Sequence, residues 1–138
     1  MKRSKFGLFP TETDDKTVLL YINKVDFRVV NIHDFIYFQY NGEMRLWEAV
    51  TAQSSCKPHT IATPFTVSYP LKRRISSNDI LSLSPSFVQV HQRYIVNIRM
   101  IESVIDNVCR LIPPYQEITH ITVSSRYCKD LKSRFPAL

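Results

Sequence analysis

The stretch from Phe87 to Asn97 decides the fold of this chain and reads Phe-Val-Gln-Val-His-Gln-Arg-Tyr-Ile-Val-Asn. From Phe87 to His91 the side chains alternate in a way that predicts a half-buried β-strand. The run from Ile95 to Ile98 is β-branched and predicts a second short strand. The polar residues Gln92 and Arg93 then fall in the turn between the two strands.

Further short β-prone runs lie on both sides of this stretch. They are Thr17 to Ile22, Lys24 to Ile32, Phe35 to Tyr40, Met44 to Ala52, Thr60 to Tyr69, Ile101 to Ile105, Val108 to Ile112 and Glu117 to Val123. Asn41-Gly42 predicts a β-hairpin with a type I′ turn, because both residues tolerate a positive φ. The polar segment from Gln53 to His59 predicts a loop, and Pro64 should interrupt the run around it or place that run at a sheet edge. The sequence therefore predicts a mostly β domain.

Two segments have helical patterns instead. The first runs from Ser76 to Leu83, since Ser76 or Ser77 can cap its start and Pro85 stops it. No helix pair of the length that a helix-turn-helix motif requires is evident, so that mode of DNA binding is disfavoured.

The second helical segment lies at the end of the chain, and Ser124 or Ser125 can cap it. It has an apolar stripe made of Tyr127, Leu131 and Phe135, and a basic stripe made of Arg126, Lys129 and Lys132. The sequence thus predicts a terminal helix that packs with one side and is basic on another.

Length and charge limit what the chain can be. Its 138 residues, 44% of them hydrophobic, suit one domain with a core. We expect residues 17–138 to form that domain and residues 1–16 to be a flexible tail or a linker stub. The formal charge of +6 and the pI of about 9.4 favour anionic partners such as nucleic acid.

Several function classes are disfavoured by composition. With only two glycines, Gly7 and Gly42, a glycine-rich phosphate-binding loop is nearly excluded. The four histidines are scattered without metal-ligand spacing, so we expect no metal site, no cofactor and no catalysis. The three cysteines are far apart and odd in number, which indicates reduced thiols in a cytoplasmic protein. No apolar run approaches the roughly 18 residues that a membrane helix needs.

Three pieces of the sequence resemble the LytTR family of DNA-binding domains. In that family a strand ending in His leads through polar residues into Tyr-Ile-Val-Asn, as from Phe87 to Asn97, and an isoleucine follows, here Ile101. The second piece, from Ile121 to Arg126, is an apolar strand that enters a Ser-x-Arg turn before the final helix. The third and weaker piece is Ile32 to Phe38. The pieces occur in the family's order, and the resemblance covers about residues 17–135.

The resemblance implies a fold and a function. The fold is an elongated antiparallel β domain of about eight to ten short strands, with one short internal helix and a C-terminal helix. Such domains insert loops, rather than a recognition helix, into successive grooves of duplex DNA. Family members are mostly bacterial response regulators of two-component systems that bind repeated promoter sites. We therefore expect sequence-specific binding of double-stranded promoter DNA by a bacterial transcription regulator. A homodimer on the DNA and a separate receiver or sensor protein remain open as further partners.

The resemblance also places the DNA contacts on three segments of this sequence. Side-chain chemistry makes Arg45, Gln92 and Arg126 the candidates for base contacts. The candidates for contacts to the DNA backbone are Asn41, Met44, His91, Arg93, Ser124, Ser125, Lys129 and Lys132. Some residues of these motifs have a structural alternative: His91 can instead shape its turn, Tyr94 to Val96 are expected in the core, and Asn97 is expected to bind backbone groups.

The sequence departs from the family pattern in three places. The segment from Ser54 to Pro64 is longer than the corresponding connection, and the turn before the last helix carries one arginine, Arg126, where many relatives carry two basic residues. No receiver domain precedes the motif, so we expect a stand-alone regulator or a fragment without intrinsic phosphorylation control. These departures leave a second interpretation open, in which a protein-interaction module of the same fold blocks a regulator and binds no DNA.

Overall fold

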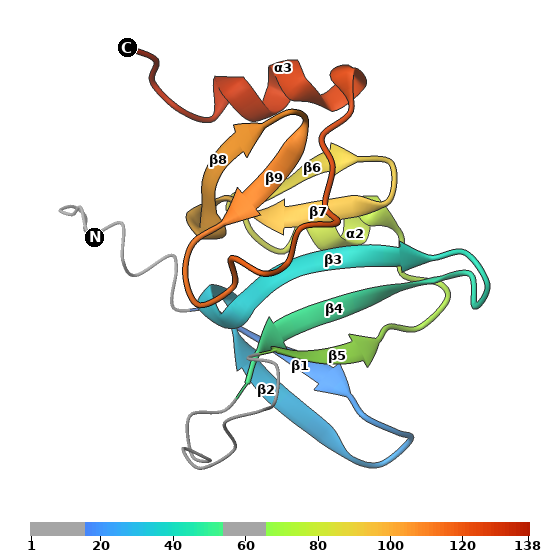
Figure 1. Cartoon of the computed structure of the whole chain (residues 1–138). Helices are drawn as coiled ribbons and strands as arrows, with labels where there is room; N and C mark the ends of the chain where they lie inside the picture. Colours follow the sequence, from blue (N-terminus) through green and yellow to red (C-terminus); the bar gives the residue numbers. More distant parts are fainter. Residues whose placement is uncertain (1–15, 54–65) are drawn as a thin grey trace, which may run out of the picture.

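The computed structural model of the chain describes residues 16–53 and 66–138, and a five-stranded antiparallel sheet forms its centre (Figure 1). The order of its strands is β5-β4-β3-β7-β6. Their bounds are Phe35–Asn41 for β3, Leu46–Ala52 for β4, Thr66–Pro70 for β5, Phe87–His91 for β6 and Tyr94–Asn97 for β7. The stretch from Phe87 to Asn97 is therefore the β6–β7 hairpin, at one edge of this sheet.

Two small antiparallel sheets and two helices complete the described part. One small sheet pairs β1 (Thr17–Tyr21) with β2 (Phe27–Asn31), and the other pairs β8 (Ile101–Ile105) with β9 (Val108–Leu111). The helices are α2 (Ser77–Leu81) and α3 (Ser125–Ser133). The predicted mostly β, antiparallel fold with one internal and one C-terminal helix is confirmed. The predicted tail over residues 1–16, the loop from Gln53 to His59 and the first half of the strand from Thr60 to Tyr69 fall almost entirely outside the described residues.

Each face of the central sheet carries its own hydrophobic core. One face packs against β8–β9, the segment that leads into α3, and α3 itself; its buried side chains include Tyr37, Val50, Val96, Ile121 and Leu131. The other face packs against β1–β2 and α2, with Phe35, Phe38, Trp47, Phe87 and Ile80 among its buried side chains. The rings of Phe35, Phe38 and Phe87 lie 5.1–5.7 Å apart, centroid to centroid. The alternation of side chains along the strands thus fills both layers.

The same local structure, a strand that ends in a short 3-10 turn, occurs twice. The sequence Val-Asn-Ile leads into both turns, at Val30 to Ile32 and at Val96 to Ile98, and its isoleucine is the first residue of each turn. In each, the asparagine side chain accepts a hydrogen bond from the backbone N–H two residues on, at 2.8 Å for Asn31 and 3.1 Å for Asn97. Asn97 also donates from Nδ2 to the carbonyl of Phe35 at 2.9 Å and is fully buried. The expectation that Asn97 binds backbone groups is confirmed.

The internal helix begins with a capping box. Ser76 accepts a hydrogen bond from the backbone N–H of Asp79 at 3.2 Å, and the Asp79 carboxylate accepts one from the backbone N–H of Ser76 at 2.8 Å. Hydrogen bonds to the carboxylate from the Ser76 backbone, the larger cause, and from the Ser76 side chain lower the pKa of Asp79, with a smaller contribution from Arg74. Of the two predicted caps, the structure uses Ser76, and the capping box holds Ile80 against the core.

Replacing Ser76 with alanine should lower the free energy of unfolding by about 1 kcal/mol, because one end of the capping box is lost. It should also raise the pKa of Asp79 part of the way toward its ordinary value, because the hydrogen bond from the Ser76 side chain is lost while that from the Ser76 backbone, the larger cause, remains. A depressed carboxyl pKa stabilises the fold above the unfolded pKa and loses its effect as pH falls through the folded one. Acid unfolding curves and carboxyl NMR titration of both proteins measure the two effects, and an unchanged Asp79 titration would contradict this account.

The hairpin predicted at Asn41-Gly42 is confirmed, but its turn type is not. Gly42 does not have a positive φ, whereas Arg45 does, at 59°. The Asn41 side-chain oxygen accepts hydrogen bonds from the backbone N–H groups of Glu43 and Met44 at 3.0 and 3.1 Å. Because Asn41 caps a wider turn in this way, the chain reverses over four residues. The two consecutive positive φ values of a type I′ turn occur instead at Asp106 and Asn107, between β8 and β9.

Two predictions near the end of the chain are wrong in part. The segment from Glu117 to Val123 is not a strand, because two successive turns precede its contact with β9. In the first turn the backbone N–H of Tyr115 donates to the carbonyl of Ile112, and in the second the N–H of Ile118 donates to the carbonyl of Tyr115. Within the described residues the segment pairs through one isolated bridge, between Val108 and Thr122. Phe135 is not part of the apolar stripe, since α3 ends at Ser133 and the ring is 45% exposed. Pro136 disfavours a helical conformation at Phe135, which explains where the helix stops.

Within residues 16–53 and 66–138 no helix has both the length and the apolar character to cross a membrane. The same residues contain no group of three or more histidine, cysteine or acidic side chains arranged to hold a metal ion. Burial raises the pKa of the Cys109 thiol to about 11, while Cys128 is half-buried.

Candidate nucleic-acid interface

The turn between β3 and β4 presents the first group of candidate residues. Arg45 occupies the left-handed backbone position of the turn, its N–H donates to the carbonyl of Asn41 at 2.8 Å, and its side chain is exposed. Met44 is 50% exposed, and its carbonyl accepts a hydrogen bond from Nε of Arg73 at 3.1 Å. The Asn41 side chain is fully engaged, since its Nδ2 donates to Glu48 at 3.2 Å and its oxygen caps the turn. Arg45 is therefore the exposed cation of this turn, which also contains the exposed acid Glu43.

The turn between β6 and β7 presents the second group. Nδ1 of His91 accepts a hydrogen bond from the backbone N–H of Arg93 at 3.0 Å, and the His91 ring lies 5.3 Å from that of Tyr94. His91 thus shapes the turn, as one of its two predicted roles requires. With Nδ1 as the acceptor, a neutral ring carries its proton on Nε2, where it remains a donor. The side chains of Gln92 and Arg93 are exposed.

These two turns lie next to one another. The backbone N–H of Tyr40 donates to the carbonyl of Arg93 at 2.9 Å, which ties the end of β3 to the β6–β7 turn. The Arg93 side chain then extends beside the β3–β4 turn, where a Cβ on Gly42 would stand 3.6 Å from its Nη1. The guanidinium group of one turn therefore borders the other turn, and their candidate residues form one surface.

The start of α3 joins this surface from the other side. The backbone N–H of Ser124 donates to the carbonyl of Val90 at 2.9 Å, so the helix begins beside the residue that precedes His91. Ser124 occupies the N-cap position, as predicted, but its side chain makes no capping hydrogen bond. Ser125, Arg126 and Lys129 are exposed, and the Arg126 guanidinium carbon lies 5.6 Å from the centre of the Tyr127 ring. The positive end of the helix dipole also points to this side, which favours an anion there.

Figure 1 shows the resulting arrangement: the start of α3, the β6–β7 turn and the β3–β4 turn follow one another along one side of the molecule. We call these three segments the loop edge. Ten of the eleven candidates, those other than Lys132, belong to the loop edge or to the turn of α3 that follows it. Lys132 is exposed but lies in the last turn of α3, away from the β6–β7 turn. Segments far apart in the sequence thus meet in one place.

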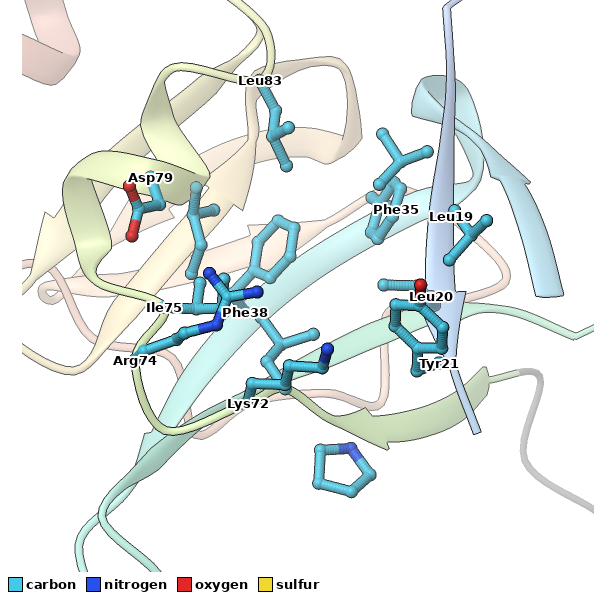
Figure 2. A pocket seen from close by; sticks show the side chains of 14 residues that line it. Leu19, Leu20, Tyr21, Phe35, Phe38, Lys72, Arg74, Ile75, Asp79 and Leu83 are labelled. Carbon is cyan, nitrogen blue, oxygen red and sulfur yellow. The ribbon is translucent and has the colours of Figure 1, made fainter. Parts of the chain in front are cut away.

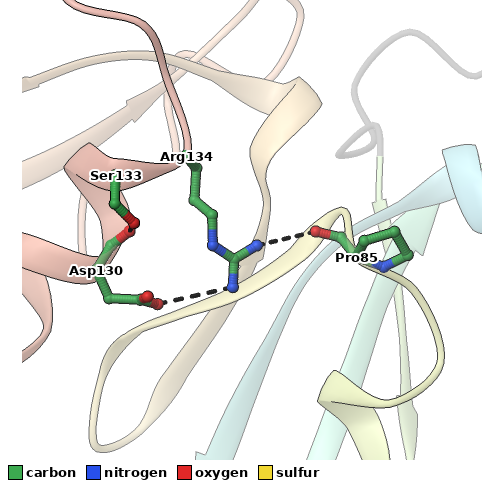
Figure 3. Close-up of polar contacts among 4 residues, drawn as sticks. All are labelled: Pro85, Asp130, Ser133 and Arg134. Atoms are coloured by element: carbon green, nitrogen blue, oxygen red, sulfur yellow. Dashed lines mark hydrogen bonds and ion pairs between the residues drawn. The ribbon is translucent and has the colours of Figure 1, made fainter.

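The far end of α3 is anchored rather than free. Nη1 of Arg134 donates to the carbonyl of Pro85 at 2.9 Å, and its Nη2 lies 3.6 Å from the carboxylate of Asp130 (Figure 3). The hydroxyl of Ser133 donates to the carbonyl of Asp130 at 2.6 Å. Arg134 therefore fixes the helix to the connection between α2 and β6, and it partly neutralises Asp130. Nothing in the sequence around Arg134 indicates this role, because its partner lies 49 residues away.

A polar network behind the loop edge was also missed. Nε2 of Gln39 donates to Glu48 at 3.1 Å, and Oε1 of Gln39 lies 3.2 Å from Nε2 of His120. That histidine is also 3.4 Å from the Tyr37 hydroxyl, and burial, with Tyr94 and Glu48 nearby, raises the Tyr37 pKa to about 12. The Glu48 carboxylate, which accepts from Gln39 and Asn41, is held in place by these hydrogen bonds. Gln39 and Glu48 face each other across a predicted hairpin, so the strand pairing was enough to suggest their contact. Nothing in the sequence suggested that His120 contacts them.

Comparisons with known proteins identify this type of domain. The family model of the LytTr DNA-binding domain matches residues 26–135. A solved structure, the LytTr DNA-binding domain of a protein described as a methyl-accepting/DNA response regulator from Bacillus cereus, is similar with a TM-score of 0.56. The two chains are 16% identical, and the match covers 85% of this chain and 94% of the other. No curated protein sequence matches. Because the family model spans most of the residues, this chain belongs to the LytTR family of DNA-binding domains.

Proposed function

We propose that this domain binds double-stranded promoter DNA sequence-specifically, as the DNA-reading part of a bacterial transcription regulator in the cytoplasm. The observation that carries the proposal is the loop edge, in which two backbone hydrogen bonds bring the three candidate segments of a LytTR domain together. Segments that protrude along one side of a domain suit successive grooves on one face of a duplex. The exposed arginines and lysines there supply the positive charge that DNA binding requires.

The proposed roles follow from the hydrogen-bonding groups that each side chain exposes. Arg45, Gln92 and Arg126 are exposed and suit base edges: an arginine can donate twice to guanine, and a glutamine amide can pair with adenine. Arg93, Lys129 and Lys132 suit phosphates, as do the hydroxyls of Ser124 and Ser125. His91 can donate to a phosphate from Nε2, while Asn41 and Met44 contribute through the shape of their turn and their backbone.

Selection from a random pool of duplexes, followed by anisotropy titration of the selected site, tests this proposal. Affinity for the selected duplex should fall linearly with the logarithm of the salt concentration. The three cationic backbone candidates alone predict a slope of roughly −3. A scrambled duplex of the same composition should bind much more weakly at every salt concentration. Salt-insensitive binding, or no binding to any duplex in the pool, would contradict the proposal.

The wider assembly follows from the family context and is part of the same proposal. Repeated promoter sites would place two copies of the domain on one DNA, and a separate receiver or sensor protein would supply the input signal of a two-component system. Analytical ultracentrifugation on duplexes with one and two copies of the selected site measures this stoichiometry. A single copy bound to the two-site duplex would contradict the repeat arrangement without affecting DNA binding itself.

The second candidate function is a protein-interaction module that pairs with a regulator. A specific observation favours a protein contact: on one face of the β1–β2 hairpin, Leu19, Tyr21, Phe27 and Val29 are 45–56% exposed. Clustered exposed apolar side chains often mark interaction sites. A stoichiometric complex with a regulator, combined with no binding to any selected duplex, would favour this function over DNA binding.

A further inference from the structure

A pocket lies on the side of the central sheet that faces β1 and α2, and the proposed DNA contacts do not use it. Its volume is about 280 Å³, near the lower end of the range for sites that bind small molecules. Leu20 from β1, Phe35 and Phe38 from β3, and Ile80 from α2 form its walls and are buried. Leu71, Ile75 and Leu83 complete the apolar lining. The interior is therefore apolar and suits a hydrocarbon group rather than a sugar or a nucleotide.

The rim of this pocket carries positive charge. Lys72 and Arg74 extend over the opening from the segment that follows β5 (Figure 2). The Lys72 ammonium group lies 4.3 Å from the centre of the Tyr21 ring, so a cation–π contact holds it at the mouth. Lys16 adds a third cation beside the wall, where its Nζ donates to the carbonyl of Leu83 at 3.0 Å.

One acidic side chain, Asp79, also lines the pocket, so the rim carries two cations, Lys72 and Arg74, against one anion. The Asp79 carboxylate is directed toward Ser76, whose backbone N–H donates to it at 2.8 Å. Arg74 makes no hydrogen bond or ion pair within residues 16–53 and 66–138, although its charge helps to lower the Asp79 pKa. An apolar interior beneath Lys72 and Arg74 is thus complementary to a ligand with a hydrocarbon chain and a single anionic head.

We propose that this pocket binds a medium-chain fatty acid, with the alkyl chain among Leu20, Phe38 and Ile80 and the carboxylate between Lys72 and Arg74. The size of the pocket excludes a complete phospholipid, and its apolar lining excludes a small polar anion. The position is also suited to an effector: Arg73, between the two rim cations, donates to the carbonyl of Met44 in the β3–β4 turn. Binding itself does not depend on the proposed DNA function, because the pocket and the loop edge share no candidate residue.

Isothermal titration of the full chain with hexanoate, octanoate and decanoate, without DNA, tests the proposal. We expect saturable binding of one molecule per chain, with affinity rising by up to about fourfold per added methylene until the pocket is full. Decan-1-ol should bind more weakly than decanoate, and decylamine more weakly still, because the rim is cationic. Binding that does not saturate, or that is equal for the acid and the amine, would overturn the proposal.

Two variants test the contributions of the ligand's carboxylate and of its alkyl chain separately. Lys72→Glu/Arg74→Glu should weaken decanoate binding at least about tenfold and leave decan-1-ol binding nearly unchanged. The matched control is Lys24→Glu/Arg110→Glu, which changes the net charge equally at exposed positions outside the pocket and should have little effect. Leu83→Trp should fill the pocket and weaken both ligands. An equal loss in the control would show that net charge alone attracts the acid, and that result would overturn the proposal.

A measurement on the unaltered protein keeps the proposal testable if a variant fails to fold. Decanoate should shift the methyl NMR signals of Leu20, Ile75 and Ile80 and leave those of Val104 and Ile105, on β8, in place. Shifts confined to β8, or spread evenly over the exposed apolar residues, would contradict binding in the pocket. Binding to vesicles of anionic phospholipid without any binding of free decanoate would show a membrane contact and would equally overturn the proposal.

Discussion

Replacing Asn97 with alanine should lower the free energy of unfolding by about 3 kcal/mol, close to the loss expected for a large core side chain. The side chain is fully buried at the end of β7, and it donates to the carbonyls of Phe35 and Ile32 at 2.9 and 3.4 Å. Its oxygen accepts from the N–H of Arg99 at 3.1 Å. Alanine removes all three hydrogen bonds. The Ile32 carbonyl keeps a second bond, from the N–H of Phe35, but the Phe35 carbonyl loses its Asn97 partner in a buried place, and an unsatisfied buried group costs about 1–3 kcal/mol. Urea unfolding curves of both proteins measure the difference.

The matched control is Asn31→Ala, in the other Val-Asn-Ile unit. Asn31 accepts the equivalent hydrogen bond, from His33, but it is only half-buried and has no carbonyl partners of its own among the described residues. Its loss should therefore cost only about 1 kcal/mol, which is typical of a capping residue. Equal losses in the two variants would show that capping, rather than the bonds to Ile32 and Phe35, accounts for the effect of Asn97.

Asn97 also shows how much of a side chain's role could be predicted from the sequence. Its type and its place after an apolar strand indicated a residue that binds backbone groups, and the structure agrees. The partner carbonyls belong to a turn more than sixty residues earlier, and no local pattern can reveal that pairing. The same limit applies to Arg134 and to His120, whose partners are 49 and 81 residues away.

Predictions based on local backbone chemistry had mixed success for a physical reason. Ser76 caps its helix as expected, since serine and Asp79 satisfy each other within one turn. The Asn-Gly pair predicted the hairpin but not its turn, because Asn41 has a competing role for its side chain as the cap of a wider turn. The segment from Glu117 to Val123 has strand propensity, but the turns before it leave room for only one bridge to β9. Tertiary geometry thus overrides strand propensity where preceding turns limit how much of a segment can pair with its neighbour.

The loop edge is a further example of a feature that the sequence contains only in parts. The family resemblance named three segments, and side-chain chemistry selected the residues within each. That the segments meet depends on two backbone hydrogen bonds, from Tyr40 to Arg93 and from Ser124 to Val90. Backbone groups carry no residue identity, so this adjacency could be inferred from the family but not from the residues.

If the loop edge reads DNA as proposed, Arg45→Gly/Arg126→Ala should have the largest effect on recognition of the selected site. Each arginine that reads a base contributes roughly 1–3 kcal/mol of discrimination. The two side chains lie on different segments and share no partner, so their effects should add to roughly 2–6 kcal/mol. Glycine is chosen at position 45 because the backbone there has a φ of 59°, which glycine adopts without strain. Any loss of affinity then reflects the missing guanidinium group rather than a distorted turn.

Competition between the selected duplex and a scrambled duplex at one salt concentration measures this loss in the double variant. Lys24→Ala/Arg110→Ala, at exposed positions outside the loop edge, also removes two positive charges and is the control for net charge. The double variant should bind both duplexes almost equally and keep nearly the salt dependence of the original domain, because its phosphate contacts remain. Arg93→Ala and Lys129→Ala should do the opposite, with a salt slope that is smaller by about 1 each and an unchanged base preference. If the double variant retained its preference for the selected site, Arg45 and Arg126 would not be the residues that read it, and specificity would have to come from Gln92 or from the shape of the DNA.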